Sequence, residues 1–148
     1  MIALVPFFFL KRWRHDAVYL FVTLLTSALF VYLLKFTVRR VRPWIALGLP
    51  PPFHAPTDFS FPSGHATGPA TVAAFVLVLA WRRHRAIPLP LYVLIPIAFA
   101  VALARVVLGV HWPLDIAVGM MLGAIVGAIG GAQRARKIEA EATPAPTE

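Results

Sequence analysis

The sequence predicts an all-α transmembrane helical bundle with four full spans and a short N-terminal apolar segment. Of its 148 residues, 59% are hydrophobic and 14% are charged, whereas a soluble domain carries about a quarter charged residues. Several runs of about 18 residues carry no formal charge, which is enough to cross a bilayer at roughly 1.5 Å per residue. The spans must be helical, because lipid offers no partners to open backbone.

The first ten residues are apolar but too short to span a bilayer. Positive residues follow this stretch at Lys11, Arg12 and Arg14 instead of preceding it, which argues against a signal peptide. We expect the stretch to lie in the membrane interface or to end a span that begins upstream. The first full span is then residues 17–34.

The second and third spans are predicted at residues 65–81 and 86–104. Pro88 and Pro90 stand at the start of the third span, where a missing N–H is harmless. Pro96 stands inside it and predicts a kink there.

The fourth span, residues 113–133, carries a glycine at every fourth position, so that the glycines form a stripe on one helix face. Such a stripe lets a neighbouring helix approach closely. It also permits a homodimer, and the face that would form it consists of Gly119, Gly123 and Gly127.

We take residues 1–138 as a single integral membrane domain. Residues 139–148 are polar and contain prolines, which predicts a disordered tail. The chain has no cysteine, which excludes disulfides and thiolate chemistry.

A formal charge of +8 suggests nucleic-acid binding in a soluble protein, but no stacking aromatics alternate with these basic residues. We therefore expect no nucleic-acid partner, and interpret the cations as flanks of the spans. Three clusters fall on one side of the membrane, which the positive-inside rule assigns to the cytoplasm. They are Lys11, Arg12 and Arg14, then Arg82, Arg83 and Arg85, and finally Arg134, Arg136 and Lys137.

The remaining cations all fall on the opposite side, against that rule, and an anionic ligand would hold them there. They are Lys35, Arg39, Arg40, Arg42 and Arg105.

Lys35 and Arg42 are seven residues apart, so they share a face if the first helix continues to Pro43. Two cations on one stripe repel each other unless an anion lies between them. The alternative is that their long side chains simply reach the lipid headgroups.

Residues Pro62-Ser63-Gly64-His65 open the second span. The free N–H groups and the partial positive charge of a helix start suit a phosphate, and Gly64 lets the backbone approach a ligand. Alternatively, Ser63 is an ordinary N-cap and His65 an interfacial histidine.

His111 and Asp115 are four residues apart and thus neighbours on a helix. A carboxylate bonded to one imidazole nitrogen fixes the tautomer and frees the other nitrogen to attack. Taken alone, the His111 and Asp115 pair could be an ordinary polar start of a helix. Taken alone, Arg105 could be a charged residue that simply ends an apolar span. Together, these residues form a phosphoryl-transfer site in which cations neutralise the oxygens, one histidine attacks phosphorus and the other transfers protons.

Three spaced motifs carry a resemblance to a known family. Lys35-x6-Arg42-Pro43, Pro62-Ser63-Gly64-His65 and Arg105-x5-His111-x3-Asp115 resemble, in order, the signature of the type 2 phosphatidic acid phosphatase (PAP2) family. That family includes bacterial polyprenyl diphosphate phosphatases and shares its site with vanadium haloperoxidases. The resemblance implies a PAP2/haloperoxidase-like core.

The resemblance also implies roles for the matching residues. His111 is the nucleophile that forms a phosphohistidine, Asp115 orients it, and His65 is the general acid and then the base. The phosphoryl oxygens are bound by Lys35, Arg42 and Arg105, with help from Ser63 and the Gly64 backbone.

The implied function is hydrolysis of a lipid phosphate or diphosphate of the phosphatidate, phosphatidylglycerophosphate or undecaprenyl diphosphate class. No cofactor is implied, and no metal is needed because cations carry the charge; two histidines without cysteine are also a poor zinc ligand set. The protein is expected in a bacterial inner membrane, with its site facing the periplasm or extracellular side.

The chain departs from the family pattern in two ways. Ala104 stands where the third motif usually has serine, and the first full span stands where bacterial members have their third. These departures favour an alternative, a catalytically weak or inactive PAP2-like lipid-binding membrane protein. A vanadate haloperoxidase is less favoured because those relatives are soluble. His54 and Asp58 are expected to be polar loop residues outside the site.

Overall fold

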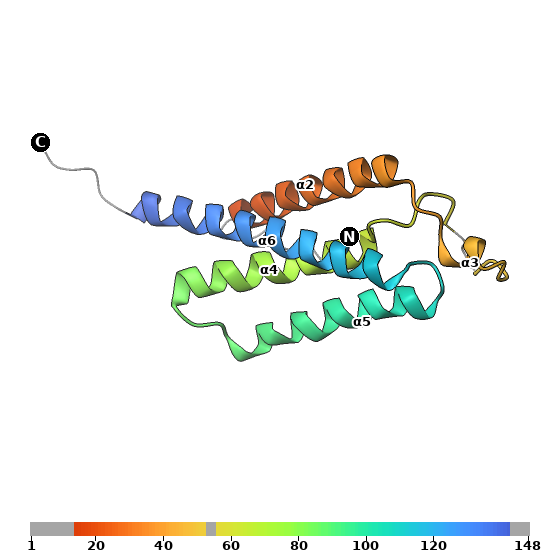
Figure 1. Cartoon of the computed structure of the whole chain (residues 1–148). Helices are drawn as coiled ribbons and strands as arrows, with labels where there is room; N and C mark the ends of the chain where they lie inside the picture. The colour runs from red at the N-terminus through yellow and green to blue at the C-terminus, as the bar shows by residue number, and fades with distance from the viewer. Residues whose placement is uncertain (1–13, 53–55, 143–148) are drawn as a thin grey trace, which may run out of the picture.

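The computed structural model describes residues 14–52 and 56–142, and every regular element in these ranges is helical (Figure 1). The apolar N-terminal stretch and His54 lie outside the described residues. The elements are α2 (Arg14–Val38), α3 (Pro43–Ala46), α4 (Gly64–His84), the 3-10 helix η2 (Leu89–Val93), α5 (Leu94–Val107) and α6 (Pro113–Ala142).

Four helical segments are long and apolar enough to cross a membrane, which confirms the predicted bundle of four spans. Helices α4 and α6 pack along each other at the centre. Helix α2 contacts both of them, and α5 packs mainly on α4 (Figure 1). The segments are Arg14–Ala46, Gly64–His84, Leu89–Val107 and Pro113–Ala142.

The third span is not one continuous α-helix. It opens as η2 after Pro88, and α5 begins at Leu94, so Pro96 lies in the first turn of α5. Pro96 was predicted to kink the interior of the span. The structure instead has Pro96 in the first turn of α5, a position where proline is tolerated, and the kink itself stays a prediction.

The glycine stripe of α6 lies against α4 of the same chain. A Cβ added at Gly123 would meet the Thr67 carbonyl oxygen at 2.3 Å, and one added at Gly127 would meet that of Thr71 at 2.3 Å. Only residues without a Cβ allow this approach. The predicted homodimer through Gly119, Gly123 and Gly127 is therefore wrong, because α4 covers that face and buries it.

Substitution Gly123→Ala is expected to destabilise the bundle markedly, by about 1–3 kcal/mol or more, since overpacking forces the two backbones apart. Gly68→Ala is the matched control, because a Cβ at Gly68 has nothing within 4 Å. Thermal unfolding in detergent, followed by circular dichroism, should show a lower Tm for Gly123→Ala alone. Equal Tm values for the two variants would contradict the close contact.

An ion-pair cluster joins three helices at the end of the bundle that carries the predicted cytoplasmic cations. Arg134 Nε lies 2.6 Å from Asp16 Oδ1, and Arg83 Nη1 lies 2.9 Å from Asp16 Oδ2. The Arg134 guanidinium also lies over the Tyr19 ring, 5.5 Å from its centre. The start of α2, the end of α4 and the last turns of α6 therefore meet, as the charge pattern predicted.

The C-terminal tail was predicted to be disordered from residue 139, and this boundary is wrong. Helix α6 continues to Ala142, so residues 139–142 are helical. Glutamate and alanine both favour helix, and Glu141 Oε2 lies 3.8 Å from Arg134 Nη1. Residues 143–148 lie outside the described residues.

Candidate active site

The two cations of the first motif meet although they do not share a helix. Helix α2 ends at Val38, Arg39 has a left-handed φ of 52°, and Arg42 is extended before Pro43. The condition under which they would share a helix face, that the first helix continues to Pro43, is not met, because the left-handed Arg39 follows the end of the helix at Val38. The turn instead brings Lys35 and Arg42 together around one carboxylate.

That carboxylate belongs to Asp58. Its Oδ2 lies 3.0 Å from Lys35 Nζ, and its Oδ1 pairs with Arg42 Nη2. Lys35 Nζ also donates to the Phe59 carbonyl oxygen. An anion of the chain itself thus lies between the two cations.

Arg42 connects two loops. Its side chain is 3% exposed, its Nε donates to the Asp58 carbonyl oxygen at 2.8 Å, and its Nη1 donates to that of Val110 at 2.7 Å. The same Nη1 lies 3.5 Å from His111 Nε2. The guanidinium is therefore fixed beside one nitrogen of the His111 ring.

The other nitrogen of His111 faces Asp115 in the first turn of α6. Nδ1 lies 3.5 Å from Asp115 Oδ2, slightly longer than an ordinary hydrogen bond. The His111 side chain is 4% exposed and that of Asp115 is fully buried. The Arg105 carbonyl oxygen accepts hydrogen bonds from the backbone N–H groups of Val110 and His111, each at 3.2 Å. The arrangement turns Nδ1 to the carboxylate and Nε2 to the cations.

Ser63 precedes α4 but its hydroxyl does not cap the helix. It has the N-cap position without a side-chain cap bond, and its buried Oγ has no partner in the described structure. Its backbone N–H donates instead to the Asp115 carbonyl oxygen at 3.1 Å. The hydroxyl is therefore left over for another partner, which favours the ligand interpretation over the N-cap alternative.

His65 and Arg105 complete the cluster. His65 follows Gly64 in the first turn of α4 and is exposed. Its imidazole is close enough to Arg105, His111, Arg42 and Lys35 to interact with them electrostatically. Arg105 Nε is buried without a partner among the described residues. The structure thus gathers all eight sequence-predicted site residues around one end of α4 and α6.

Three residues that contact this cluster were missed or given no role by the sequence analysis: Asp58, Arg40, whose Nη1 lies 2.9 Å from Asp115 Oδ1, and Ser60, whose side chain hydrogen-bonds to Asp115. Arg40 was only counted among the cations, Asp58 was assigned to the loop, and Ser60 was not singled out. Asp58 was recognisable as a lone carboxylate between the first two motifs. Arg40 carried no such signal, because nothing in the sequence shows which of the neighbouring arginines turns inward.

The site is rich in hydrogen-bond donors and poor in metal ligands. No group of three His, Asp or Glu side chains within residues 14–52 and 56–142 could hold a metal ion. Guanidinium, ammonium, hydroxyl and backbone N–H groups converge instead, and this donor set suits a tetrahedral oxyanion.

Asp58 remains ionised well into acid. Partial burial opposes its ionisation, but hydrogen bonds and charge attraction from Lys35 and Arg42 outweigh that effect, so the pKa of Asp58 lies below its usual value. Its ion pairs therefore contribute stability above the unfolded-state pKa near 4, and this contribution is lost as pH falls through the lower folded-state pKa.

Asp58→Asn is expected to tighten binding of inorganic phosphate about fivefold, because it removes the competing carboxylate from two partly exposed ion pairs. Since the Asp58 pKa is lowered, the ratio to the unchanged protein should stay constant from about pH 7 down to about pH 4.5 and shrink only at lower pH. Equilibrium titration by calorimetry measures both values. The control is Thr57→Asn, an exposed neighbour, and equal affinity for all three proteins would contradict competition.

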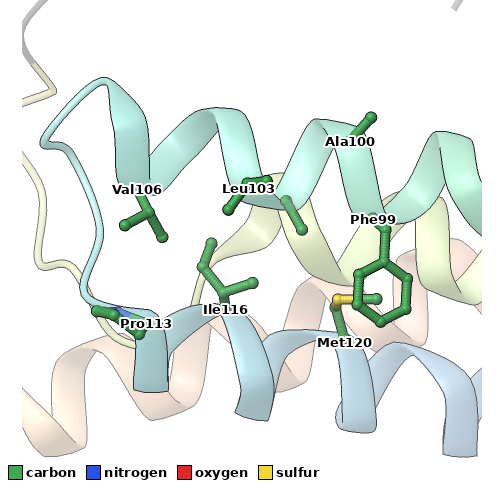
Figure 2. Close-up of a pocket in the computed structure, with 8 residues that line it drawn as sticks. Phe99, Ala100, Leu103, Val106, Pro113, Ile116 and Met120 are labelled. Carbon is green, nitrogen blue, oxygen red and sulfur yellow. The ribbon is translucent and has the colours of Figure 1, made fainter.

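An apolar groove of about 270 Å³ runs between α5 and α6. Figure 2 shows Val106 and Pro113 at the end nearer the connecting loop, with Phe99 and Met120 at the other end. Val106 follows Arg105 in the sequence, and Pro113 stands between His111 and Asp115, so this end of the groove is lined by chain neighbours of the cluster. The remaining lining residues are Ala100, Ala102, Leu103 and Ile116.

Comparison with known proteins gives consistent matches. The family model described as "PAP2 superfamily" matches residues 16–138. The chain is 48% identical to decaprenylphosphoryl-5-phosphoribose phosphatase of Mycobacterium tuberculosis over 113 residues, which are 71% of this chain and 56% of that protein. It is 32% identical to undecaprenyl-diphosphatase of Sulfolobus acidocaldarius over 118 residues, which are 76% of this chain and 52% of that protein.

Two solved structures resemble the fold. The crystal structure of Aquifex aeolicus LpxE superimposes with a TM-score of 0.67 at 27% identity, covering 86% of this chain and 73% of that one. A transmembrane PAP2-type phosphatidylglycerolphosphate phosphatase from Bacillus subtilis superimposes with a TM-score of 0.65 at 24% identity, covering 94% and 66%. The chain spans about half the length of the two curated relatives described above.

Proposed function

Because this chain belongs to the PAP2 superfamily, we propose that it is a membrane phosphatase that hydrolyses a lipid phosphate or diphosphate through a phosphohistidine intermediate. The main support is the position of His111. Its Nδ1 faces a buried carboxylate while its Nε2 lies 3.5 Å from the Arg42 guanidinium. This pairing of nucleophile and oxyanion site is what phosphoryl transfer requires.

In the first step, the Nε2 lone pair of His111 attacks phosphorus and the P–O bond to the leaving group breaks. His65 gives a proton to the leaving oxygen. Lys35, Arg42 and Arg105 neutralise the non-bridging oxygens, and the free Ser63 hydroxyl and Gly64 N–H add hydrogen bonds. Asp58 must give up its ion pairs with Lys35 and Arg42 to admit the phosphate.

In the second step, water attacks phosphorus and gives its proton to neutral His65. The P–N bond breaks and returns the electron pair to His111, so inorganic phosphate leaves and both histidines recover their starting states. The three cations carry the electrostatic role that a metal has in other phosphatases, so the proposed mechanism is metal-independent.

The groove between α5 and α6 supports a substrate with a hydrocarbon chain. An apolar cavity of about 150 Å³ already holds a molecule the size of benzene, and this groove of about 270 Å³ is lined at one end by Val106 and Pro113, which are chain neighbours of Arg105 and His111. A phosphate among the cations would place its chain along the groove. Two relatives are named for polyprenyl substrates, so polyprenyl phosphates and diphosphates are the first compounds to test.

We place the site at the periplasmic or extracellular face of a bacterial inner membrane. The cluster around Asp16 joins the helix ends that carry the predicted cytoplasmic cations. Lys35, Arg42 and Arg105 lie at the other end of the bundle. A bound phosphate group there accounts for cations on a side where the positive-inside rule does not expect them.

The test is release of inorganic phosphate by the purified full chain in detergent. Polyprenyl phosphate, polyprenyl diphosphate, phosphatidate and phosphatidylglycerophosphate are compared with chainless p-nitrophenyl phosphate. We expect at least one lipid to be hydrolysed with a kcat/KM about tenfold or more above p-nitrophenyl phosphate, because chain binding adds to transition-state affinity. If no lipid is hydrolysed, the proposal is wrong.

Ala104 favours one second candidate, a catalytically weak lipid-binding protein of the same family. It precedes Arg105, where the resembling motif has a serine hydroxyl. The observation that supports this candidate is binding of a lipid phosphate without turnover. Ala104→Ser then distinguishes a slow enzyme, in which kcat rises, from a binding protein, in which turnover stays absent.

A further inference from the structure

The carboxylate of Asp115 is fully buried and yet bound on both oxygens. Oδ1 accepts a hydrogen bond from Arg40 Nη1 at 2.9 Å. Oδ2 accepts one from the Trp112 backbone N–H at 2.9 Å and faces His111 Nδ1 at 3.5 Å. Arg40 and His111 thus approach opposite oxygens of one carboxylate.

Arg40 reaches this position through the turn that ends α2. The left-handed Arg39 redirects the chain, and the Arg40 carbonyl oxygen then accepts a hydrogen bond from the Ser60 N–H at 2.8 Å. The guanidinium lies over the Trp112 ring, 5.4 Å from its centre. Backbone and side chain are therefore both held, which fixes the direction of the guanidinium.

A buried ionised carboxylate is unfavourable unless a cation pairs with it. Among the residues that the structure describes, Arg40 is the one arginine or lysine within ion-pair distance of Asp115. Its bond to Oδ1 also leaves Oδ2 directed at the imidazole. Without Arg40, Asp115 would either take up a proton or rotate toward another donor, and Oδ2 would no longer face His111 Nδ1, a buried nitrogen that has no other partner in the described structure.

We propose that Arg40 is a positioning residue that acts through Asp115, keeping the carboxylate ionised and directed at Nδ1 so that Nε2 of His111 carries the lone pair. Arg40 occupies one of the six unspecified positions between Lys35 and Arg42 in the first motif, and it touches no phosphate in this assignment. The kinetic consequence rests on the proposed function, but the control of the His111 tautomer does not.

The test compares Arg40→Gln with Arg39→Gln, a matched control at the exposed neighbour, whose Nε bonds only to the Phe36 carbonyl oxygen in the described structure. Nitrogen-15 NMR of the ligand-free protein reports which His111 nitrogen is protonated. We expect Arg40→Gln to lose the Nδ1–H form and Arg39→Gln to keep it.

In turnover of the best lipid phosphate, kcat of Arg40→Gln should fall about 10- to 100-fold with KM little changed, as for other residues that orient a functional histidine. Arg40→Lys, which keeps the charge, should restore most of it.

The double variant Arg40→Gln/Asp115→Asn separates positioning from folding. It contains no uncompensated buried charge, so it should fold even if Arg40→Gln does not, and its kcat should be no lower than that of Asp115→Asn alone. Additive losses in the double variant, or an unchanged His111 tautomer in Arg40→Gln, would overturn the proposal. If the unchanged protein hydrolyses no lipid phosphate, the proposed function fails, and the NMR comparison still decides the role of Arg40.

Discussion

Replacement of His111 by alanine is expected to abolish hydrolysis of lipid phosphates, with kcat lower by about 10⁴-fold or more, as when a covalent nucleophile is removed. The reason is geometric: His111 is the imidazole whose Nε2 lies beside Arg42 while its Nδ1 faces Asp115. The measurement is phosphate release from the lipid that the unchanged protein hydrolyses fastest.

The matched control is His84→Ala, an exposed histidine at the far end of α4, which should keep full activity. When turnover of a phosphorus-32-labelled substrate is quenched rapidly without acid, the unchanged protein should carry covalently bound label on its phosphohistidine. The His111→Ala variant should carry none. Because the His111 side chain is buried, the Tm of the variant must be compared as well. Full activity in a folded His111→Ala protein would exclude the assigned mechanism.

His65→Ala is expected to lower kcat for a lipid monophosphate by about 10²- to 10⁴-fold, the usual contribution of a general acid or base. The effect should depend on the leaving group. The p-nitrophenolate ion leaves without a proton, so p-nitrophenyl phosphate should still phosphorylate His111. Hydrolysis of the phosphohistidine still needs the base, so the variant should show one rapid burst of p-nitrophenol followed by slow turnover.

His65 suits this experiment because its side chain is exposed and alanine is a better helix former in the first turn of α4. The variant should therefore keep its Tm. Equal losses with both substrates and no burst would show that His65 does not transfer protons. If the burst appears with His65→Ala and is absent with His111→Ala, the two variants separate the attacking imidazole from the proton-transferring one.

The sequence by itself determined the four spans, because apolar length and the absence of charge report directly on transfer into lipid. It also determined which residue types reach one surface, because helices of bilayer length carry Lys35, His65 and Arg105 to the same end. The motifs at 62–65 and 105–115 are local in the sequence, so their members lie close together along the chain, although His111 lies in the loop before α6 and not on the helix with Asp115 as predicted.

Only the tertiary structure decided which surfaces and charges meet. The stripe of Gly119, Gly123 and Gly127 predicts a close helix contact. Which helix makes that contact depends on long-range packing, and the structure shows that it is α4 of the same chain instead of a second chain. Likewise, the end of α2 at Val38 depends on the turn at Arg39 and Arg40, and that turn selects Arg40 as the partner of Asp115. Ion pairs between residues 40 and 115, or 58 and 35, leave no periodic trace in a chain, because distance along the sequence does not encode how a loop folds back.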